Sequence, residues 1–373
     1  MSEKKLRHVY IGAGAGIFKG RHKKVLDLPT LEVVGVSDID PDRAKAVGEE
    51  LGVPYWVDHK DMLAELKPDV AVITTPHPFH ASIAIDCLNA GAHVLTEKPM
   101  AVRISEADAM IEAAKANDRL ICVNFQQRFR SDSKTMKRIM DEGVLGKIQH
   151  FDMIVPWPRT KAYFTNKPWS GQWLGEGGGV LINQGPHNLD HVIYLMGGLP
   201  KRLFAWNRNQ VHGIETEDTV QAMVEWDNGA LGTIHLSTAE AGRDERVEIV
   251  GTKGTLQVVK DGTFSLRVMD KDFRDYVLDP NITTKSPEVK EVKVNLDDGD
   301  GSHREVYEDF HSAILNGTPL LNNAEQGRMC VELSNAMIYS NFRKTEVRFP
   351  LDRAAFDELF DELIAGKHPD KAL

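Results

Sequence analysis

The chain has 373 residues, of which 42% are hydrophobic and 27% charged, and its formal net charge is -10. This length allows two domains with separate cores, and the negative charge argues against a nucleic-acid-binding surface. No apolar run reaches the roughly 18 residues needed to span a membrane, so we expect no nucleic acid and no membrane as partner.

The three cysteines, Cys87, Cys122 and Cys330, lie far apart and form no C-x-x-C pair. This spacing predicts neither a disulfide framework nor a thiolate metal site, so we expect buried thiols in a reducing compartment. The chain enters a predicted strand within a few residues of Met1 and shows no apolar signal-peptide core. We therefore expect a cytoplasmic protein.

Residues 6–125 contain short apolar runs rich in Val and Ile, separated by helical patterns. The runs are HVYIGAG, LEVVGVSD, DVAVITT, AHVLTE and LICVNF. Alternating strands and helices predict βαβ units and therefore a doubly wound parallel sheet. Pro41 and Gly52 are placed to begin and end the helix after the second strand. This α/β domain is predicted to span residues 1–125.

The pattern changes after residue 125. FRSDSKTMKRIMDEGVLG predicts a helix that Gly143 and Gly146 end, and strand-like runs such as TVQAMVEW, ALGTIHLST, RVEIVG and GTLQVV follow up to about residue 296. Helices return at REVYEDFHSAILNG, NAEQGRMCVELSNAMIYSNF and AAFDELFDELIAG. Strands in succession predict an α+β domain over 126–350 with a large, mostly antiparallel open sheet. A helical tail is predicted over 351–373.

The turn after the first strand, YIGAGAGIFKG, is rich in glycine and opens a predicted helix. Glycines at such a turn let the backbone approach a pyrophosphate, which the N–H groups of a helix N-terminus bind. Gly12 and Gly14 fit the dinucleotide fingerprint, but its third glycine would fall at Ile17, between Gly16 and Gly20. The fingerprint is therefore imperfect, and its place between a strand and a helix supports it.

Asp38 ends the second strand 24 residues after Gly14. An acid about 20 residues beyond the glycine turn is expected to bind a ribose hydroxyl, and a carboxylate there repels a 2′-phosphate. NAD is therefore favoured over NADP, and Arg43 is the nearest base that could reverse this preference. The alternative is a glycine turn without a ligand and an aspartate that caps the next helix.

A second unusual stretch is GEGGGVLINQGPHNLDHVIYLMG. Three successive glycines imply a close approach of the backbone, and HNLDHVIYLM predicts a helix. Asn183 and His187 share a face if the helix begins before Asn183, whereas Pro186 favours a start near residue 185. From spacing alone, His187 is either a proton acceptor or a structural histidine. We expect no metal, because the spacing of His187 and His191 lacks the glutamate of H-E-x-x-H and a nearby thiolate.

Several segments together resemble the glucose-fructose oxidoreductase, inositol dehydrogenase and rhizopine-catabolism (Gfo/Idh/MocA) family. They are GAG at the first turn, TTPHPFH at 74–80, GAHVLTEKPM at 91–100, NFQQRF at 124–129, GVLGKI at 143–148 and GGGVLINQGPHNLDH at 177–191. The resemblance runs from residue 6 to about residue 350. It implies a nicotinamide-binding Rossmann domain, NAD-dependent oxidation of CH–OH groups, and a homodimer or homotetramer that forms through the sheet of the second domain.

The resemblance also implies roles for residues. Lys98, in TEKPM, is expected to lie beside the nicotinamide and the substrate hydroxyl, and His187 is expected to accept the proton. The family position that matches Asn183 is often Asp, so Asn183 is expected to hydrogen-bond to substrate rather than to titrate. The implied cofactor-binding set is Gly12, Gly14, Ala15, Gly16, Ile17, Asp38, Arg43, Thr75, Pro76, His80, Glu97, Lys98 and Gln126.

Lys98 directly follows a predicted buried strand, at the end where ligands of open α/β sheets bind. A fixed ammonium there would stabilise alkoxide character while a hydroxyl proton is removed and hydride leaves. Pro99 would fix the approach of Lys98, and Glu97 would hold the ammonium or pack locally. Without the resemblance, a surface ion pair between Glu97 and Lys98 is an equal alternative.

The segment RTKAYFTNKPWSGQWLGEG offers aromatic rings that suit the C–H faces of a sugar. Tyr163, Trp169 and Trp173 are candidate substrate contacts, and the alternative is that these rings pack the loop onto its domain. Arg128 could bind a substrate carboxylate or only brace the domain junction.

We expect an NAD-dependent dehydrogenase that oxidises a secondary hydroxyl of a monosaccharide, cyclitol or related polyol. NAD-assisted oxidation or cleavage of a glycoside or amino sugar is one alternative. A non-catalytic dinucleotide-binding regulator is another, and the presence of both Lys98 and His187 argues against it.

Overall fold

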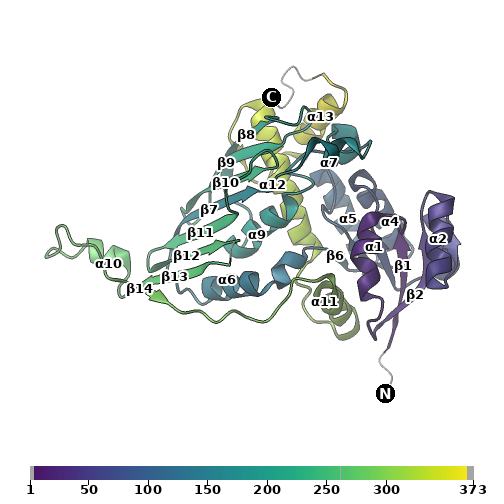
Figure 1. The fold of residues 1–373 in the computed structure, drawn as a ribbon, viewed down its shortest axis with the longest axis horizontal. Helices are drawn as coiled ribbons and strands as arrows, with labels where there is room; N and C mark the ends of the chain where they lie inside the picture. The colour runs from purple at the N-terminus through teal and green to yellow at the C-terminus, as the bar shows by residue number, and fades with distance from the viewer. Residues whose placement is uncertain (1–3, 261, 368–373) are drawn as a thin grey trace. The chain divides into compact units, whose positions relative to one another are not determined.

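The computed structural model describes residues 4–260 and 262–367, which form two compact units (Figure 1). The first unit contains the described residues up to Gln127 together with Leu174–Gly177 and Gly301–Glu332. The second contains Arg128–Trp173, Gly178–Asp300 and the described residues from Leu333 onward.

The first unit is built on a six-stranded parallel sheet with the strand order β3-β2-β1-β4-β5-β6. The strands are β1 Leu6–Ile11, β2 Leu31–Ser37, β3 Tyr55–Trp56, β4 Val70–Ile73, β5 His93–Thr96 and β6 Ile121–Val123. The predicted doubly wound sheet is therefore confirmed. The sequence did not predict β3, because two residues are too short for an apolar run.

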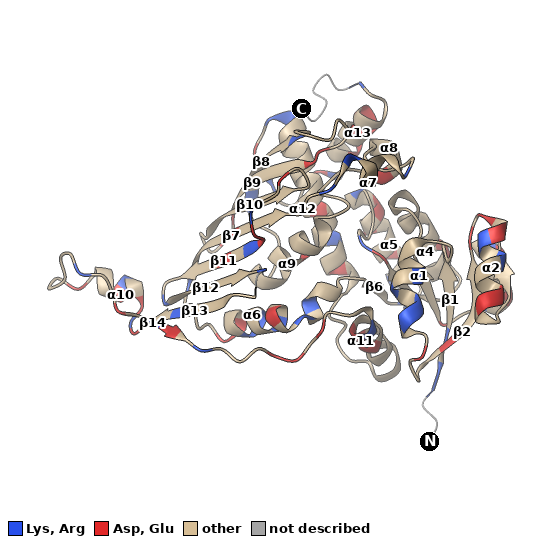
Figure 2. Cartoon of the chain, in the orientation of Figure 1, with Lys and Arg blue, Asp and Glu red and all other residues tan. Residues whose placement is uncertain are grey.

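The helices of the first unit are α1 Gly16–Gly20, α2 Pro41–Leu51, α3 His59–Leu66, α4 His80–Asn89, α5 Ile104–Ala116 and α11 His303–Asn316, with the 3₁₀ turns η1 His22–Val25 and η2 His77–Phe79. Helix α2 begins and ends at local signals. In α2, the Asp40 side chain accepts from the N–H groups of Asp42 and Arg43, and Gly52 ends the helix with a φ of 68°. Figure 2 shows acidic and basic residues along α2, whose Ala44 and Val47 are buried.

The second unit contains a nine-stranded sheet with the order β14-β13-β12-β11-β7-β10-β9-β8-β15. Its strands are β7 Ile148–Pro156, β8 Arg202–Arg208, β9 Thr219–Glu225, β10 Leu231–Ser237, β11 Arg246–Gly251, β12 Gly254–Val259, β13 Phe264–Met269, β14 Val289–Val292 and β15 Val347–Arg348. The β7–β10 pair is parallel and the neighbouring pairs are antiparallel. The prediction of a mostly antiparallel sheet is confirmed.

One face of this sheet packs against helices of the same unit (Figure 1). The helices that begin in the second unit or cross its boundary are α6 Ser131–Asp141, α7 Lys161–Thr165, α8 Trp173–Glu176, α9 Pro186–Met196, α10 Phe273–Val277, α12 Ala324–Arg343 and α13 Arg353–Ile364, with the 3₁₀ turn η3 Gln126–Phe129. Of these, α10 does not cover the sheet and buries none of its residues (Figure 1). Along β9, Val220, Ala222 and Val224 are buried, whereas Met223 is 59% exposed. This alternation is that of a sheet with one covered and one open face.

The units do not follow the predicted contiguous ranges. Residues Gly301–Glu332, which contain α11, belong to the first unit, although the prediction placed them in the domain 126–350. Helix α13 lies in the second unit, where Phe356 and Leu359 are buried, rather than forming a separate tail.

Candidate functional site

The glycine turn after β1 packs tightly on the end of β4. Gly12 has a φ of 80°, and a Cβ atom on it would lie 2.9 Å from Cγ2 of Thr75. The Thr74 hydroxyl lies 3.0 Å from the carbonyl oxygen of Ile11 and 2.9 Å from that of Gly12, and it can donate to either. A residue with a side chain therefore does not fit at position 12 without displacing this turn.

Asp38, at the end of β2, touches the same turn. The Gly14 N–H donates to Oδ2 of Asp38 at 2.8 Å, and Asp38 is 8% exposed. A Cβ atom on Gly14 would lie 2.7 Å from that oxygen and 2.8 Å from Cβ of Arg43. The guanidinium of Arg43 pairs with Asp40, at 3.1 Å between Nε and Oδ2. The acid and the glycine turn therefore meet as a dinucleotide site requires.

Polar atoms without partners also fit a bound dinucleotide in the first unit. Oγ1 of Thr75 and Oε1 of Gln126 are buried and have no hydrogen-bond partner among the described residues. Buried polar groups are normally hydrogen-bonded, so these atoms suit a ligand with donors and acceptors of its own. Around them, Ala15 precedes α1, nothing lies within 4 Å of a Cβ built on Gly16, Ile17 is 37% exposed, and Pro76 is exposed.

His80 links the two strand ends of this region. Its Nδ1 lies 2.7 Å from the carbonyl oxygen of Pro99, and its Nε2 lies 2.8 Å from that of Thr75. Both ring nitrogens of His80 thus contact protein carbonyls, so in this structure the side chain is a brace. Burial lowers the pKa of His80, and the positive charge of nearby Lys98 acts in the same direction.

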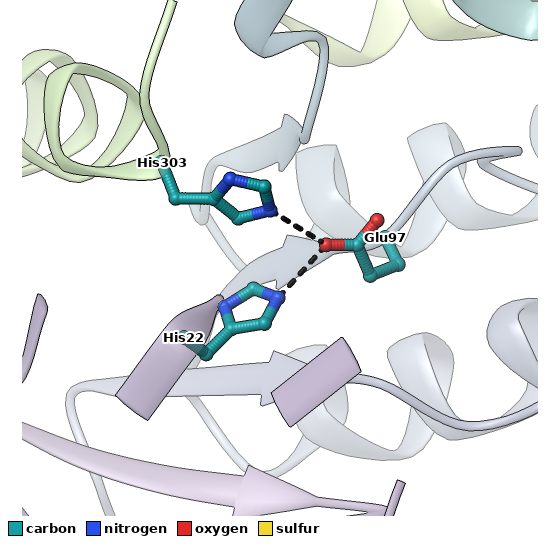
Figure 3. A group of neighbouring side chains, drawn as sticks. All are labelled: His22, Glu97 and His303. Carbon is teal, nitrogen blue, oxygen red and sulfur yellow. Dashed lines mark hydrogen bonds and ion pairs between the residues drawn. The ribbon is translucent and has the colours of Figure 1, made fainter. Parts of the chain in front are cut away.

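Glu97 turns its carboxylate into the first unit. Glu97 is 7% exposed, and its Oε1 lies 2.8 Å from Nε2 of His22 and 3.4 Å from Nε2 of His303 (Figure 3). The same oxygen accepts from Nδ2 of Asn124 at 2.6 Å. Burial by itself would raise the pKa of Glu97, but the contacts from His22 and His303 outweigh it and hold that pKa well below its usual range. The alternative of an exposed ion pair does not fit, because Glu97 is buried and Lys98 is half-buried.

His22, Asn124 and His303 were not predicted as site residues from the sequence. Asn124 stands in the segment NFQQRF, which carries part of the family resemblance, and this segment is a signal by which it could have been found. His22 and His303 are separated by 281 residues, and no local pattern joins them.

In the second unit, the end of the glycine run hydrogen-bonds to Glu217. Oε1 of Glu217 accepts from the N–H groups of Gly179 at 2.9 Å and Leu181 at 3.0 Å. A Cβ atom on Gly179 would lie 1.8 Å from the carbonyl oxygen of Glu217. The close backbone approach that the three glycines imply is therefore present at Gly179.

Asn183 and His187 follow this run. Helix α9 begins at Pro186, so His187 lies in its first turn and Asn183 in the preceding turn. The start near residue 185 is correct, and the two residues do not share a helix face. Nδ2 of Asn183 lies 3.4 Å from the Tyr163 hydroxyl, and Nε2 of Gln184 lies 3.2 Å from it. Asn183 and Tyr163 thus lie together, in a different unit from Lys98.

Two other candidates for substrate contact have structural partners in the second unit. Arg128 is fully buried, and its Nε donates to Oδ2 of Asp190 at 2.8 Å, which favours the bracing alternative. Trp173 is 5% exposed and packs edge-on against Phe342 and Phe360, as a core residue does. Trp169 is half-buried, with the Lys167 ammonium 5.4 Å from its ring.

Among the described residues, His22, Glu97 and His303 form a group with the composition of a metal-binding set. No described helix is long and apolar enough to cross a membrane.

Comparison with known proteins places the chain in a family. Residues 6–125 match the oxidoreductase family NAD-binding Rossmann fold, and residues 133–257 match the GFO/IDH/MocA C-terminal domain. The myo-inositol 2-dehydrogenase of Thermotoga maritima is 27% identical over 255 residues, which are 66% of this chain and 73% of that protein. The D-glucoside 3-dehydrogenase of Escherichia coli is 30% identical over 235 residues, which are 61% of this chain and 64% of that protein.

Among solved structures, the WlbA dehydrogenase from Chromobacterium violaceum, in complex with NADH and UDP-GlcNAcA, superposes with a TM-score of 0.81 at 26% identity. The superposition covers 94% of this chain and 98% of that one. These matches agree with the glycine turn, Asp38 and the two sheets. The chain belongs to the GFO/IDH/MocA family of oxidoreductases, and NAD is its cofactor.

Proposed function

We propose that this protein is a dehydrogenase that oxidises a secondary hydroxyl of a monosaccharide, cyclitol or related polyol to a ketone. The observation that carries the proposal is Lys98. It follows β5 at the carboxyl end of the parallel sheet, in the same unit as the glycine turn and Asp38. Ligands of open α/β sheets bind at that end.

Three side chains are assigned roles in the oxidation. NAD supplies the hydride acceptor when bound. The ammonium of Lys98 stabilises the alkoxide character that develops on the substrate oxygen. His187 accepts the hydroxyl proton as general base, and Asn183 donates to or accepts from a substrate hydroxyl.

The substrate class rests on relatives and on one local arrangement. Named relatives act on myo-inositol and on D-glucosides, which are ring polyols. The Tyr163 hydroxyl beside Asn183 adds an aromatic ring of the kind that packs on sugar C–H faces. Tyr163 and Trp169 remain proposed substrate contacts. Arg128 is assigned to bracing through Asp190, and Trp173 to the core of the second unit.

A glycoside or amino-sugar derivative is the second candidate. It is favoured by the 30% identity to the D-glucoside 3-dehydrogenase and by the UDP-GlcNAcA bound to the WlbA dehydrogenase. The non-catalytic regulator is disfavoured, because a sensor has no need of both Lys98 and His187.

We also propose that the open sheet face of the second unit joins copies of this chain into a homodimer or homotetramer. Trp206, Met223 and Leu231 stand on β8, β9 and β10 with 44%, 59% and 54% of their surface exposed. Large apolar side chains on an open face mark an interaction surface. Light scattering of the purified protein tests this, and a monomer would contradict it. The three buried cysteines are consistent with a cytoplasmic, reducing setting.

The experiment that tests the function is a substrate panel. The purified protein is incubated with NAD and free sugars, inositols, anhydrosugars or glycosides, and NADH formation is followed by absorbance. We expect turnover with at least one ring polyol. Tight NAD binding without turnover of any class would contradict the proposal and favour the regulator.

A further inference from the structure

The group around Glu97 joins distant parts of the first unit. His22 comes from η1, Asn124 follows β6, and His303 begins α11. His22 and Asn124 hydrogen-bond to one oxygen, Oε1 of Glu97, and Nε2 of His303 lies 3.4 Å from the same oxygen, at ion-pair distance; Figure 3 shows the two histidines. Two N–H donors and a neighbouring imidazole around one carboxylate oxygen are an arrangement that stabilises an ionised carboxylate in a buried place.

The hydrogen bonds around His22 have one consistent direction. Nδ1 of His22 lies 2.8 Å from the hydroxyl oxygen of Tyr307, and that oxygen lies 3.5 Å from the hydroxyl of Tyr10. An ionised Glu97 can only accept, so Nε2 of His22 must carry the proton. Nδ1 of the neutral ring then accepts from Tyr307. Burial, the largest cause, lowers the pKa of His22 and favours this neutral ring.

The segment that carries Lys98 is therefore held on both sides. On one side the Glu97 carboxylate is bound by His22 and Asn124, and on the other the Pro99 carbonyl is bound by Nδ1 of His80. Lys98 stands between these two attachments. Holding both neighbours limits the backbone freedom of Lys98, and with it the range of positions that its ammonium can reach.

A metal ion is the competing explanation, because two histidines and a glutamate are a known zinc set. Ligands of a tetrahedral zinc, with bonds of about 2.0–2.1 Å, lie roughly 3.3 Å apart. Nε2 of His303, at 3.4 Å from Oε1, has that spacing, but the contacts of Oε1 with His22 and Asn124, at 2.8 and 2.6 Å, are shorter and match charge-assisted hydrogen bonds. The Asn124 amide also uses its nitrogen there, which is a donor and not a metal ligand.

We propose that His22, His303 and Asn124 are positioning residues that fix the ionised carboxylate of Glu97 and thereby place Lys98. The role rests on the proposed function, because it concerns the lysine assigned to the reaction. Displacement of a reacting group by about 1 Å can cost ~100-fold in rate. The cluster should therefore act on kcat more than on NAD affinity.

The experiment compares two substitutions at His22. His22→Leu removes the N–H donor, whereas His22→Gln keeps an amide N–H at a similar reach. Amide hydrogen exchange of residues 96–100 is measured by mass spectrometry, together with kcat, the NAD dissociation constant and the melting temperature. We expect faster exchange in that segment and a kcat about 10- to 100-fold lower for His22→Leu, with NAD affinity within about threefold. His22→Gln should recover most of both losses.

A second pair of variants, at His303 and His311, distinguishes a specific effect on the segment from a general loss of folding. His303→Leu should reproduce the effects of His22→Leu. His311→Leu removes another buried imidazole of α11, which pairs with His8 at 3.0 Å and not with Glu97. It should leave the exchange of residues 96–100 and kcat unchanged.

Three results would overturn the proposal. The first is amide exchange and kcat that do not change in His22→Leu and His303→Leu. The second is a loss of kcat in His22→Gln or His311→Leu as large as that in His22→Leu. The third is stoichiometric zinc or another transition metal in the purified protein. If no substrate is turned over, the proposed function fails, but the exchange comparison still decides whether the cluster holds residues 96–100.

Discussion

At the scale of single residues, Asp38 is the residue proposed to determine which dinucleotide the glycine turn accepts. Because its carboxylate contacts Gly14 and repels a 2′-phosphate, NAD should bind more tightly than NADP, and Asp38→Ala should narrow this difference about tenfold. Titration of both cofactors by tryptophan fluorescence measures it. Asp42→Ala, an exposed acid of the next helix, is the control. Equal or tighter NADP binding by the unmodified protein would contradict this role and indicate that Arg43 binds the 2′-phosphate.

His187 is the residue proposed to move the proton. Its replacement in His187→Asn should lower kcat/KM by roughly 10²–10⁴-fold and leave NAD affinity unchanged, because a general base acts in the transition state. In the unmodified protein, kcat/KM for oxidation should rise with pH through one ionisation. His191→Asn, one turn further along α9, controls for packing. Normal turnover by His187→Asn would show that another group carries the proton.

The residues that could be predicted are those whose signal is local. Gly12, Gly14 and Asp38 stand at fixed positions relative to a strand and a helix, and the E-K-P segment marks Lys98. Of the partners of Glu97, His22 and His303 could not be predicted, because they meet it only through the tertiary fold. The environment of Trp173 was also open in the sequence, since an aromatic ring serves equally in a core or against a sugar.

At the scale of elements, the glycine run before α9 depends on the absence of side chains. Gly179→Ala would place a Cβ atom against the Glu217 carbonyl, so the free energy of unfolding should fall by about 2–4 kcal/mol. Gly20→Ala, where nothing lies within 4 Å of the added atom, should be nearly neutral. Thermal melting of both variants checks this. A Gly179→Ala protein as stable as the unmodified one would show that the turn relaxes freely.

Helix boundaries were predictable where capping is local. Asp40 and Gly52 fix the ends of α2, and Pro186 fixes the start of α9. Strand β3 was not predictable, because its two residues carry no period. The position of α11 was not predictable either. An amphipathic pattern shows that one face of a helix is buried, but it does not show against which sheet.

At the scale of the whole molecule, buried histidines make stability depend on pH. Burial lowers the pKa of His8 to about 3 and the pKa of His191 and His311 to about 4. The unfolded chain binds these protons near pH 6.5 and the folded chain does not, so stability is full above pH 6.5 and falls as the pH drops toward 4. Each group should cost on the order of 2 kcal/mol at pH 5.

The melting temperature should therefore fall steadily between pH 7 and pH 5. His311→Gln should make that fall shallower, because one buried imidazole no longer resists protonation. Differential scanning fluorimetry across this range measures both slopes. A melting temperature that is constant or rises toward pH 5 would contradict the assignment of neutral buried histidines.

The two-sheet architecture was predictable because alternating strands and helices give way to successive strands after residue 125. That residues 301–332 belong to the first unit was not predictable, because no local feature indicates which core a helix near the end of the chain joins. These residues include His303 and Tyr307 of the first unit.

The proposed reaction depends most directly on the ammonium of Lys98, which is expected to stabilise charge on the reacting oxygen. Lys98→Met keeps much of the stem and removes the charge. The direct measurement is kcat of this variant with the best substrate of the panel, beside its NAD affinity and melting temperature. We expect a fall in kcat of at least about 100-fold, a small change in NAD affinity and an unchanged melting temperature. A variant that keeps full kcat would contradict it.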